Sequence, residues 1–166
     1  MQVLTAQAEA RKRGPEPAIS SGAYNSRPMA YLHRLKVRYG ETDQMGVVHH
    51  ANHLAYLEEA RTEYMTALGV PYSTIEAAGI GLPVRRADLR YLAPAFYEDE
   101  LEVEVQVERL RSASIRFGYR IQRPKDDVQL LEGTIELACI DLGTRRPRHL
   151  PDELRVKLEQ EAQASS

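Results

Sequence analysis

Alternating hydrophobic and polar positions predict a sheet in the second half of the chain. In the stretch 100–110, ELEVEVQVERL, Leu and Val occupy every second position, and Glu, Gln and Arg mostly fill the others. The stretch 113–122, ASIRFGYRIQ, alternates in the same way. Because successive side chains of a strand point to opposite faces, both stretches predict strands with one buried face.

Two longer stretches, 82–94 and 128–142, also predict strands, but their alternation is interrupted. In the first, the pattern slips near Arg85 and Arg86, as it does at a β-bulge. In the second, we expect an irregularity at Glu132–Gly133.

The first half of the chain predicts one strand and one long helix. An imperfect period of two over 29–39 indicates a strand. From Asn52, which we expect to be the N-cap, to Gly69, the expected C-terminal stop, apolar residues recur every three or four positions and predict a helix. Its expected buried stripe comprises Leu54, Leu57, Ala60, Tyr64, Met65 and Leu68.

Shorter segments complete the prediction. Residues 40–51 read as a loop, 72–79 as a turn or short helix capped by Ser73 or Thr74, and 152–160 as a terminal helix. Residues 1–28 lack periodicity and are expected to form a flexible leader to a single domain over 29–166.

The order of elements favours an α+β fold. Five strands and one long helix suit an antiparallel sheet whose apolar face is covered by the helix. Such a sheet leaves an open edge, which pairing with a second copy would close. We therefore expect at least a homodimer.

Composition narrows the class of protein. The chain has 166 residues, a formal net charge of −2 and 28% charged residues, which does not favour a nucleic-acid surface. A single cysteine, Cys139, excludes an internal disulfide framework and suits a reducing compartment. We find no apolar run of membrane-spanning length and no signal-peptide pattern, so we expect a cytoplasmic protein.

The segment GETDQMGVVHHANHLAYLEEAR, residues 40–61, carries the candidate chemistry. Asp43 precedes a helix start, where backbone N–H groups lack intrahelical partners and can bind a developing oxyanion. Gly46 would let the loop turn back, and the N–H of His50 is the expected donor. The alternative is that Asp43 only caps the loop through hydrogen bonds to the backbone.

This segment closely resembles the signature of hotdog-fold acyl-CoA thioesterases of the 4-hydroxybenzoyl-CoA thioesterase and YbgC type. The matching positions are Asp43, Gly46, Val48, His50, Asn52, Tyr56, Glu58, Ala60 and Arg61. The resemblance implies a five-stranded antiparallel sheet wrapped around one long helix, with active sites at a dimer interface. It also implies that Asp43 is the catalytic carboxylate, as nucleophile or as general base, and that the N–H of His50 polarises the thioester carbonyl.

Further site residues follow from the resemblance and from local charge. We expect Val48, Asn52, Tyr56 and Glu58 to bind the acyl-CoA substrate. Glu58 is also an alternative catalytic carboxylate, although pairing with Arg61 would explain it equally well.

The phosphates of coenzyme A require surface cations. The candidates are Arg85, Arg86, Arg90, Arg109, Arg111 with Ser112, and the stretch 144–149. Coenzyme A would be part of the substrate, and no separate cofactor is expected. The alternative is that these arginines are solvated surface charges.

Two other kinds of chemistry are less favoured. His50 and His53 lie one helical turn apart near His49, but no third ligand has a matching spacing, so we predict no metal site. Cys139 lies in a strand pattern and is expected in the core.

The sequence thus predicts a thioester hydrolase that releases a carboxylic acid and coenzyme A. The alternatives are a hydratase or dehydratase of acyl thioesters and a non-catalytic acyl-CoA sensor or acyl-carrier-protein partner. The acyl group, the thiol carrier and the choice between dimer and tetramer stay open.

Overall fold

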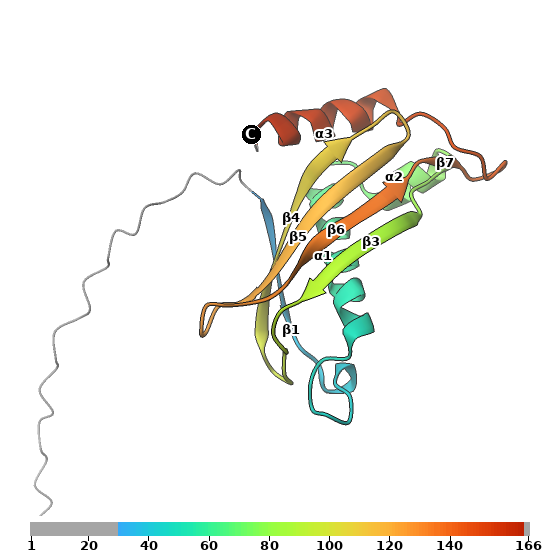
Figure 1. Ribbon diagram of the computed structural model, residues 1–166. Helices are drawn as coiled ribbons and strands as arrows, with labels where there is room; N and C mark the ends of the chain where they lie inside the picture. Colours follow the sequence, from blue (N-terminus) through green and yellow to red (C-terminus); the bar gives the residue numbers. More distant parts are fainter. Residues whose placement is uncertain (1–29, 165–166) are drawn as a thin grey trace, which may run out of the picture.

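The computed structural model describes residues 30–164 and contains a five-stranded antiparallel sheet packed on a long helix (Figure 1). The strand order is β1–β4–β5–β6–β3. The strands are β1 (Tyr31–Lys36), β3 (Val84–Tyr91), β4 (Glu100–Leu110), β5 (Ser114–Arg123) and β6 (Val128–Ala138). The predicted leader, 1–28, lies outside the described residues.

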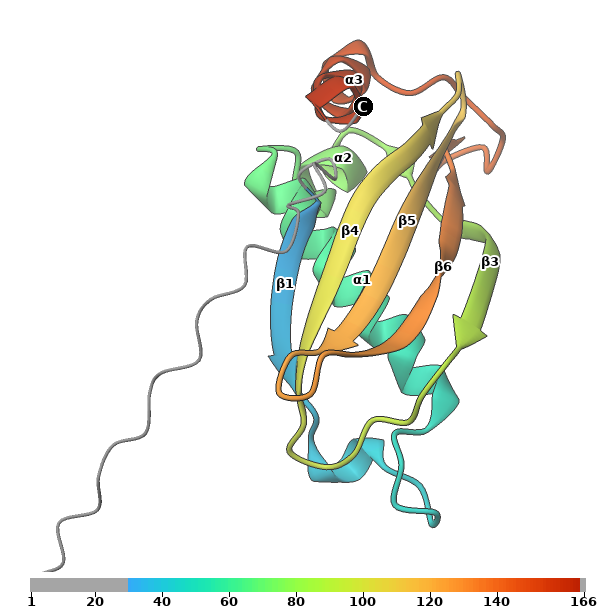
Figure 2. The same cartoon turned by 60° about the vertical axis from the view of Figure 1, so that its left-hand side comes forward.

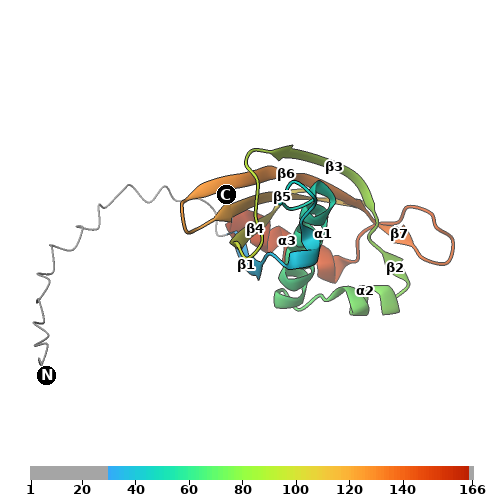
Figure 3. The same cartoon turned by 90° about the horizontal axis from the view of Figure 1, so that it is seen from below.

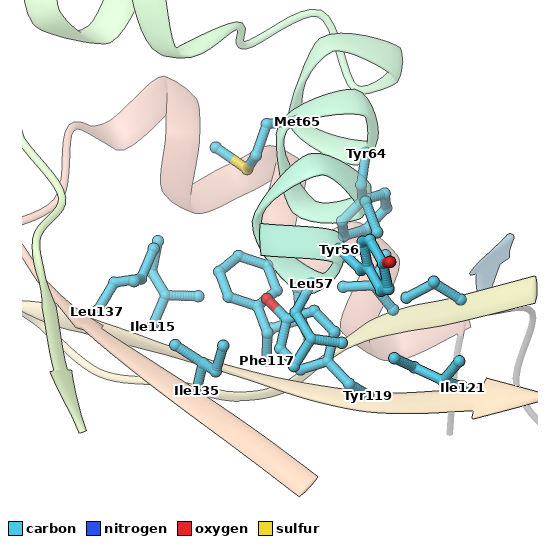
Figure 4. Close-up of a cluster of buried hydrophobic side chains, with 14 of the residues drawn as sticks. Tyr56, Leu57, Tyr64, Met65, Ile115, Phe117, Tyr119, Ile121, Ile135 and Leu137 are labelled. Carbon is cyan, nitrogen blue, oxygen red and sulfur yellow. The ribbon is translucent and has the colours of Figure 1, made fainter. Parts of the chain in front are cut away.

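Helix α1 (His50–Ala67) runs along the inner face of the sheet. Figure 2 shows it behind the strands, and Figure 3 shows the sheet arching over it. The apolar core lies between these layers, where Leu57 and Met65 of the helix face Phe117, Ile121 and Ile135 of the sheet (Figure 4). The expectation of an α+β hotdog arrangement, a five-stranded sheet around one long helix, is confirmed.

Smaller elements flank this frame. They are the 3-10 turn η1 (Tyr39–Glu41), α2 (Tyr72–Ala77), the paired short strands β2 (Ile80–Gly81) and β7 (Ile140–Asp141), and the terminal helix α3 (Asp152–Ala164). The expectation that Ser73 or Thr74 caps α2 is wrong. Pro71 is the N-cap, and it has no side-chain hydrogen bond to the helix.

Helix α1 begins three residues earlier than predicted. His49 is the N-cap, and its Nδ1 accepts a hydrogen bond from the Ala51 N–H at 3.3 Å. Asn52 lies inside the first turn, so its predicted role as the N-cap is wrong. A histidine N-cap was missed because Ser, Thr, Asp and Asn are the usual signals.

The predicted buried stripe of α1 is confirmed for four of its six residues, Leu57, Ala60, Tyr64 and Met65, and Leu68 is partly buried. His53 and Tyr56 are buried with Leu57, whereas Leu54 is 40% exposed and does not belong to the core. The stripe is centred on His53 and Leu57, and Leu54 is rotated by about 100° from His53 around the helix axis.

The predicted bulge in the first long strand is confirmed, because the register of β3 against β6 shifts between Val84 and Arg86. The predicted irregularity at Glu132–Gly133 is wrong. Both residues pair in continuous register with β3 and β5, and the register shift in β6 lies opposite Ile121 and Gln122. Gly133 instead permits close strand approach, since a Cβ there would lie 2.2 Å from the Asp88 carbonyl oxygen.

The sheet ends in two edge strands, β1 and β3. Every residue of β3 except the half-buried Leu89 is exposed. Its unpaired edge is therefore available to another chain. Among residues 30–164, no helix combines the length and the apolar composition needed to cross a membrane.

Candidate active site

The loop between β1 and α1 folds back on itself beneath the start of the helix, at the lower end of Figure 1. Thr42 and Val48 form an isolated antiparallel bridge, and the Asp43 N–H donates to the Val47 carbonyl at 2.9 Å. The Gly46 N–H donates back to the Asp43 carbonyl at 2.9 Å, with Gly46 at φ +77°. This turn places Asp43 beside the chain that enters α1.

The half-buried Asp43 uses one carboxylate oxygen within the loop. Its Oδ1 accepts a hydrogen bond from the Met45 N–H at 2.8 Å, as the alternative of a loop cap predicts. The other oxygen, Oδ2, has no hydrogen-bond partner among the described residues. The carboxylate is thus oriented by the loop while one oxygen remains available for a water molecule or a substrate.

The N-terminus of α1 supplies a donor next to this loop. Within residues 30–164, the His50 N–H has no acceptor, because it precedes the first hydrogen bonds of the helix. Such an N–H carries the partial positive charge of the helix end. Asp43 and the start of α1 together provide a carboxylate and a donor suited to an oxyanion.

A second loop, residues 93–99, supports the first. The Val48 N–H donates to the Ala95 carbonyl at 2.9 Å, and Val47 pairs with Phe96. Asp99 is buried and holds this loop by accepting from the Phe96 N–H and from Arg123, both at 2.9 Å. Burial would raise the pKa of the Asp99 carboxyl, but hydrogen bonds from Lys125, Phe96 and Arg123 outweigh it and lower the pKa.

Tyr91 and His53 lie on the side of the site nearest β3. The Tyr91 hydroxyl donates to the His50 carbonyl at 3.2 Å, and its ring packs edge-on against the His53 ring. His53 is 4% exposed, and neither ring nitrogen has a hydrogen-bond partner among the described residues. Burial lowers the pKa of His53, and the nearby carbonyl groups of His50 and His49 oppose this only in part.

The four predicted substrate-binding residues have different environments. Val48 and Tyr56 are buried, and the Tyr56 hydroxyl donates to the Glu41 carboxylate at 2.7 Å. The Asn52 side chain donates to the Glu41 carbonyl at 2.7 Å. Glu58 is exposed, and its carboxylate lies 4.0 Å from Arg61, as the alternative of a helix ion pair predicts. Substrate contact by these residues stays a prediction.

The predicted coenzyme A arginines do not lie together. Arg90 directly precedes Tyr91, whose hydroxyl reaches the His50 carbonyl, and it pairs with Glu132 at 2.7 Å. Arg109, Arg111 and Ser112 flank the β4–β5 turn, next to α3. The loop that holds Asp43 instead follows the end of β1, which pairs with the start of β4. An 11-residue strand such as β4 spans roughly 35 Å. One chain therefore does not bring these groups together.

The arginines also differ in their partners. Arg85 pairs with Glu136 at 3.5 Å, and Arg86 pairs with Asp88 at 2.7 Å. Of the described residues, none forms an ion pair with Arg109 or Arg111. In the predicted stretch 144–149, Arg148 lies 3.7 Å from Asp141, whereas Arg145 and Arg146 are exposed and likewise form no ion pair within residues 30–164. Exposed guanidinium groups without an ion-pair partner are free to bind a phosphate.

The remaining candidates from the sequence are the histidines near the start of α1 and Cys139. Within the described part of the chain, no three His, Cys, Asp or Glu side chains are placed to hold a metal ion. Cys139 is fully buried, which confirms its predicted place in the core. Burial raises the pKa of its thiol.

Sequence reasoning missed Glu41, Tyr91 and the Asp99–Arg123 pair. Glu41 lies in the segment that carries the signature, but its partners are up to 15 positions away. In the sequence, Tyr91 fits the pattern of a strand, and Asp99 lies among polar residues typical of a turn, so neither residue stands out. A polar residue that becomes buried through distant partners leaves no periodic signal.

Similar proteins are known for most of this chain. Residues 37–158 match the family model described as the thioesterase-like superfamily. The acyl-CoA thioesterase YbgC of Haemophilus influenzae is 34% identical over 123 residues, which cover 74% of this chain and 89% of that protein.

Two solved structures also match this chain over most of its length. The hypothetical protein TT1821 from Thermus thermophilus matches with a TM-score of 0.74 and 37% identity, over 78% of this chain and 98% of that one. The DHNA-CoA thioesterase from Staphylococcus aureus matches with a TM-score of 0.74 and 30% identity, over 81% of this chain and 94% of that one.

Proposed function

The chain belongs to the thioesterase-like superfamily, and from this premise we propose that it hydrolyses an acyl-CoA thioester to a carboxylic acid and coenzyme A. One observation carries the proposal. The loop that orients Asp43 lies directly beside a helix N-terminus whose first N–H, on His50, has no acceptor within residues 30–164. Relatives named for acyl-CoA hydrolysis support coenzyme A as the thiol carrier.

The proposed reaction uses both groups at once. The thioester oxygen accepts a hydrogen bond from the His50 N–H, which stabilises the negative charge that develops when the carbonyl is attacked. Asp43 either removes a proton from the attacking water or attacks the carbonyl carbon itself to form an anhydride that water then cleaves. In both routes the carbon–sulfur bond breaks and the thiolate of coenzyme A leaves.

We propose that the complete site requires two copies of the chain. The exposed edge of β3 offers a pairing surface, and Arg109 and Arg111 lie too far from Asp43 in one chain to share a substrate with it. A partner chain would bring its own arginines to the coenzyme A phosphates. This arrangement supports at least a homodimer, with a tetramer as a further possible assembly.

The test is a thiol-release assay over aryl, short-chain and long-chain acyl-CoAs. Asp43→Asn is expected to lower kcat by about 1000-fold, because the amide can neither attack nor accept the proton of water. Asp127→Asn, an exposed aspartate in the β5–β6 turn, is the matched control and should keep full activity.

Two other outcomes of the assay would contradict the proposal. Turnover that survives Asp43→Asn would move the catalytic role to Glu58. Failure of the wild-type protein on every substrate, combined with measurable acyl-CoA binding, would favour the non-catalytic sensor.

A further inference from the structure

Glu41 connects the two halves of the candidate active site. It lies two residues before Asp43, in the 3-10 turn η1, and its backbone and its side chain both contact the start of α1. Its carboxylate faces Arg38 and Tyr56, so it is directed into the fold rather than toward Asp43.

The Glu41 carboxylate accepts three hydrogen bonds. The Arg38 N–H and the Tyr56 hydroxyl donate to Oε2, each at 2.7 Å, and the Arg38 Nε–H donates to Oε1 at 2.8 Å. Burial would raise the pKa of the Glu41 carboxyl, but these three hydrogen bonds together lower it. The group is therefore a charged acceptor fixed on both oxygens.

The Glu41 carbonyl oxygen accepts two more hydrogen bonds from the other side of the loop. The His49 N–H donates to it at 2.9 Å, and the Asn52 side-chain amide donates at 2.7 Å. His49 is the N-cap of α1 and Asn52 lies in its first turn. One residue thus holds the strand that leads to Asp43 against the helix end that presents the His50 N–H.

Tyr56 makes this connection rigid. It is 2% exposed, projects from the second turn of α1 and packs in the core beside Leu57 (Figure 4). Burial raises the pKa of its hydroxyl, with the adjacent Glu41 carboxylate as a further cause. The hydroxyl therefore remains a hydrogen-bond donor to Glu41 throughout the neutral range.

We infer that Glu41 is a positioning residue that fixes the Asp43 carboxylate relative to the His50 N–H. This inference rests on the proposed thioester hydrolysis, in which those two groups act on one carbonyl. Glu41 does not contact the reacting atoms. It acts by preventing the Asp43 loop and the helix end from moving apart, and misplacement by about 1 Å can cost 100-fold in rate.

Kinetics of three variants test the inference. Glu41→Ala is expected to lower kcat by about 100-fold, with KM within about twofold of the wild-type value, because no substrate contact is removed. Glu41→Gln should lose less, since its amide oxygen still accepts from Tyr56. Tyr56→Phe, which removes one hydrogen bond and keeps the ring, should lower kcat by about three- to tenfold.

Two matched controls exclude general effects of the substitutions. Glu102→Gln removes a carboxylate that pairs with Arg34 at 2.9 Å on the outer face of the sheet. Tyr64→Phe removes a hydroxyl from another buried tyrosine of α1, about two turns beyond Tyr56 and about four turns from the loop. Both should retain the wild-type kcat when assayed well below their unfolding temperatures.

Amide hydrogen exchange supplies a readout that does not depend on activity. The Asp43 N–H donates to the Val47 carbonyl and the His49 N–H to the Glu41 carbonyl, so both amides report on this connection. In Glu41→Ala, the amides of Asp43 and His49 should exchange at least about tenfold faster, while amides in the centre of β4 keep the wild-type rate. The inference is overturned if Glu41→Ala is folded and keeps the wild-type kcat, or if its kcat falls while these amides remain protected.

The two proposals fail in different ways. Loss of activity in Asp43→Asn with normal kinetics in Glu41→Ala would retain thioester hydrolysis and remove the positioning role. A wild-type protein that hydrolyses none of the acyl-CoAs would remove the proposed function. The exchange of the Asp43 and His49 amides would then decide, by itself, whether Glu41 holds the loop to the helix.

Discussion

His53 is buried where a positive charge is disfavoured. Its ring is buried against Tyr91 and Tyr56, and neither nitrogen has a partner among residues 30–164. Burial lowers its pKa in the folded state, whereas in the unfolded chain the pKa is about 6.5. Below that pH the unfolded state binds more protons, so acid favours unfolding.

We therefore expect the free energy of unfolding to be fully maintained above about pH 6.5 and to fall as the pH decreases toward the lowered pKa of His53. His53→Phe keeps an aromatic ring and removes the titration. Urea unfolding of both proteins at pH 8 and pH 5 should show a smaller acid destabilisation in the variant. Equal losses in the two proteins would assign the pH dependence to other groups.

Substitution of Gly46 tests whether the Asp43 loop needs a backbone conformation with positive φ. At φ +77°, an L side chain is strained, although a Cβ there would meet no atom within 4 Å. Gly46→Ala should therefore lower the free energy of unfolding by about 1 kcal/mol through the backbone alone and should also lower kcat. Gly40→Ala, without positive φ and with the same open space, is the matched control. Stability is measured by urea unfolding and kcat by thiol release.

For single residues, the sequence predicts a role when that role depends on residues nearby in the chain. The spacing from Asp43 through Gly46 to His50 is enough to predict a loop that returns to a helix start. The role of Glu41 depends on Tyr56, 15 positions later, and that of Tyr91 on His50, 41 positions earlier. Such contacts form only through the fold and leave no local pattern.

At the scale of elements, regular periodicity locates strands well. The alternation of β4 gives its bounds, Glu100–Leu110, without error, because one face is buried and the other solvated. The alternation fails only after Val107, where the register against β5 shifts. The start of α1 and the irregularity in β6 were misplaced for local reasons. A histidine serves as the N-cap of α1, and the glycine of β6 serves close strand approach.

Gly133 yields a prediction about the pairing of β6 with β3. A Cβ at this position would lie 2.2 Å from the Asp88 carbonyl oxygen, which is backbone and cannot rotate away. Gly133→Ala should therefore lower the free energy of unfolding by about 3 kcal/mol, at the upper end of overpacking costs, and speed amide exchange in β3.

Gly118→Ala is the control, because the atoms within reach of its Cβ belong to the flexible Glu108 side chain. Urea unfolding should show a loss below about 1 kcal/mol for this variant. Similar losses at both positions would show that the β3 backbone moves as easily as a side chain.

At the scale of the whole molecule, the separation of Asp43 from Arg109 and Arg111 predicts that subunits complement one another. Asp43→Asn and the double variant Arg109→Ala/Arg111→Ala should each be weakly active. If each site combines Asp43 of one chain with arginines of the other, random mixing makes half the dimers mixed, each with one intact site. Refolding the two variants together should restore about a quarter of the wild-type activity.

Native mass is the control for this experiment. Both variants should elute at twice the chain mass of 18.8 kDa or at a higher multiple, as should the wild-type protein. Mixed samples that remain as inactive as the separate variants, at the same native mass, would assign the whole site to one chain.

The hydrogen bonds of Glu41 have a consequence for the order of folding. They join residues 38–56, a stretch of 19 consecutive positions, whereas the paired residues of β3 and β6 are 40 to 53 positions apart. Contacts of short sequence separation cost less chain entropy and form sooner. We expect the candidate catalytic loop to be assembled on its helix while the edge of the sheet is still unpaired, so that the chemistry of this protein is specified before its architecture is complete.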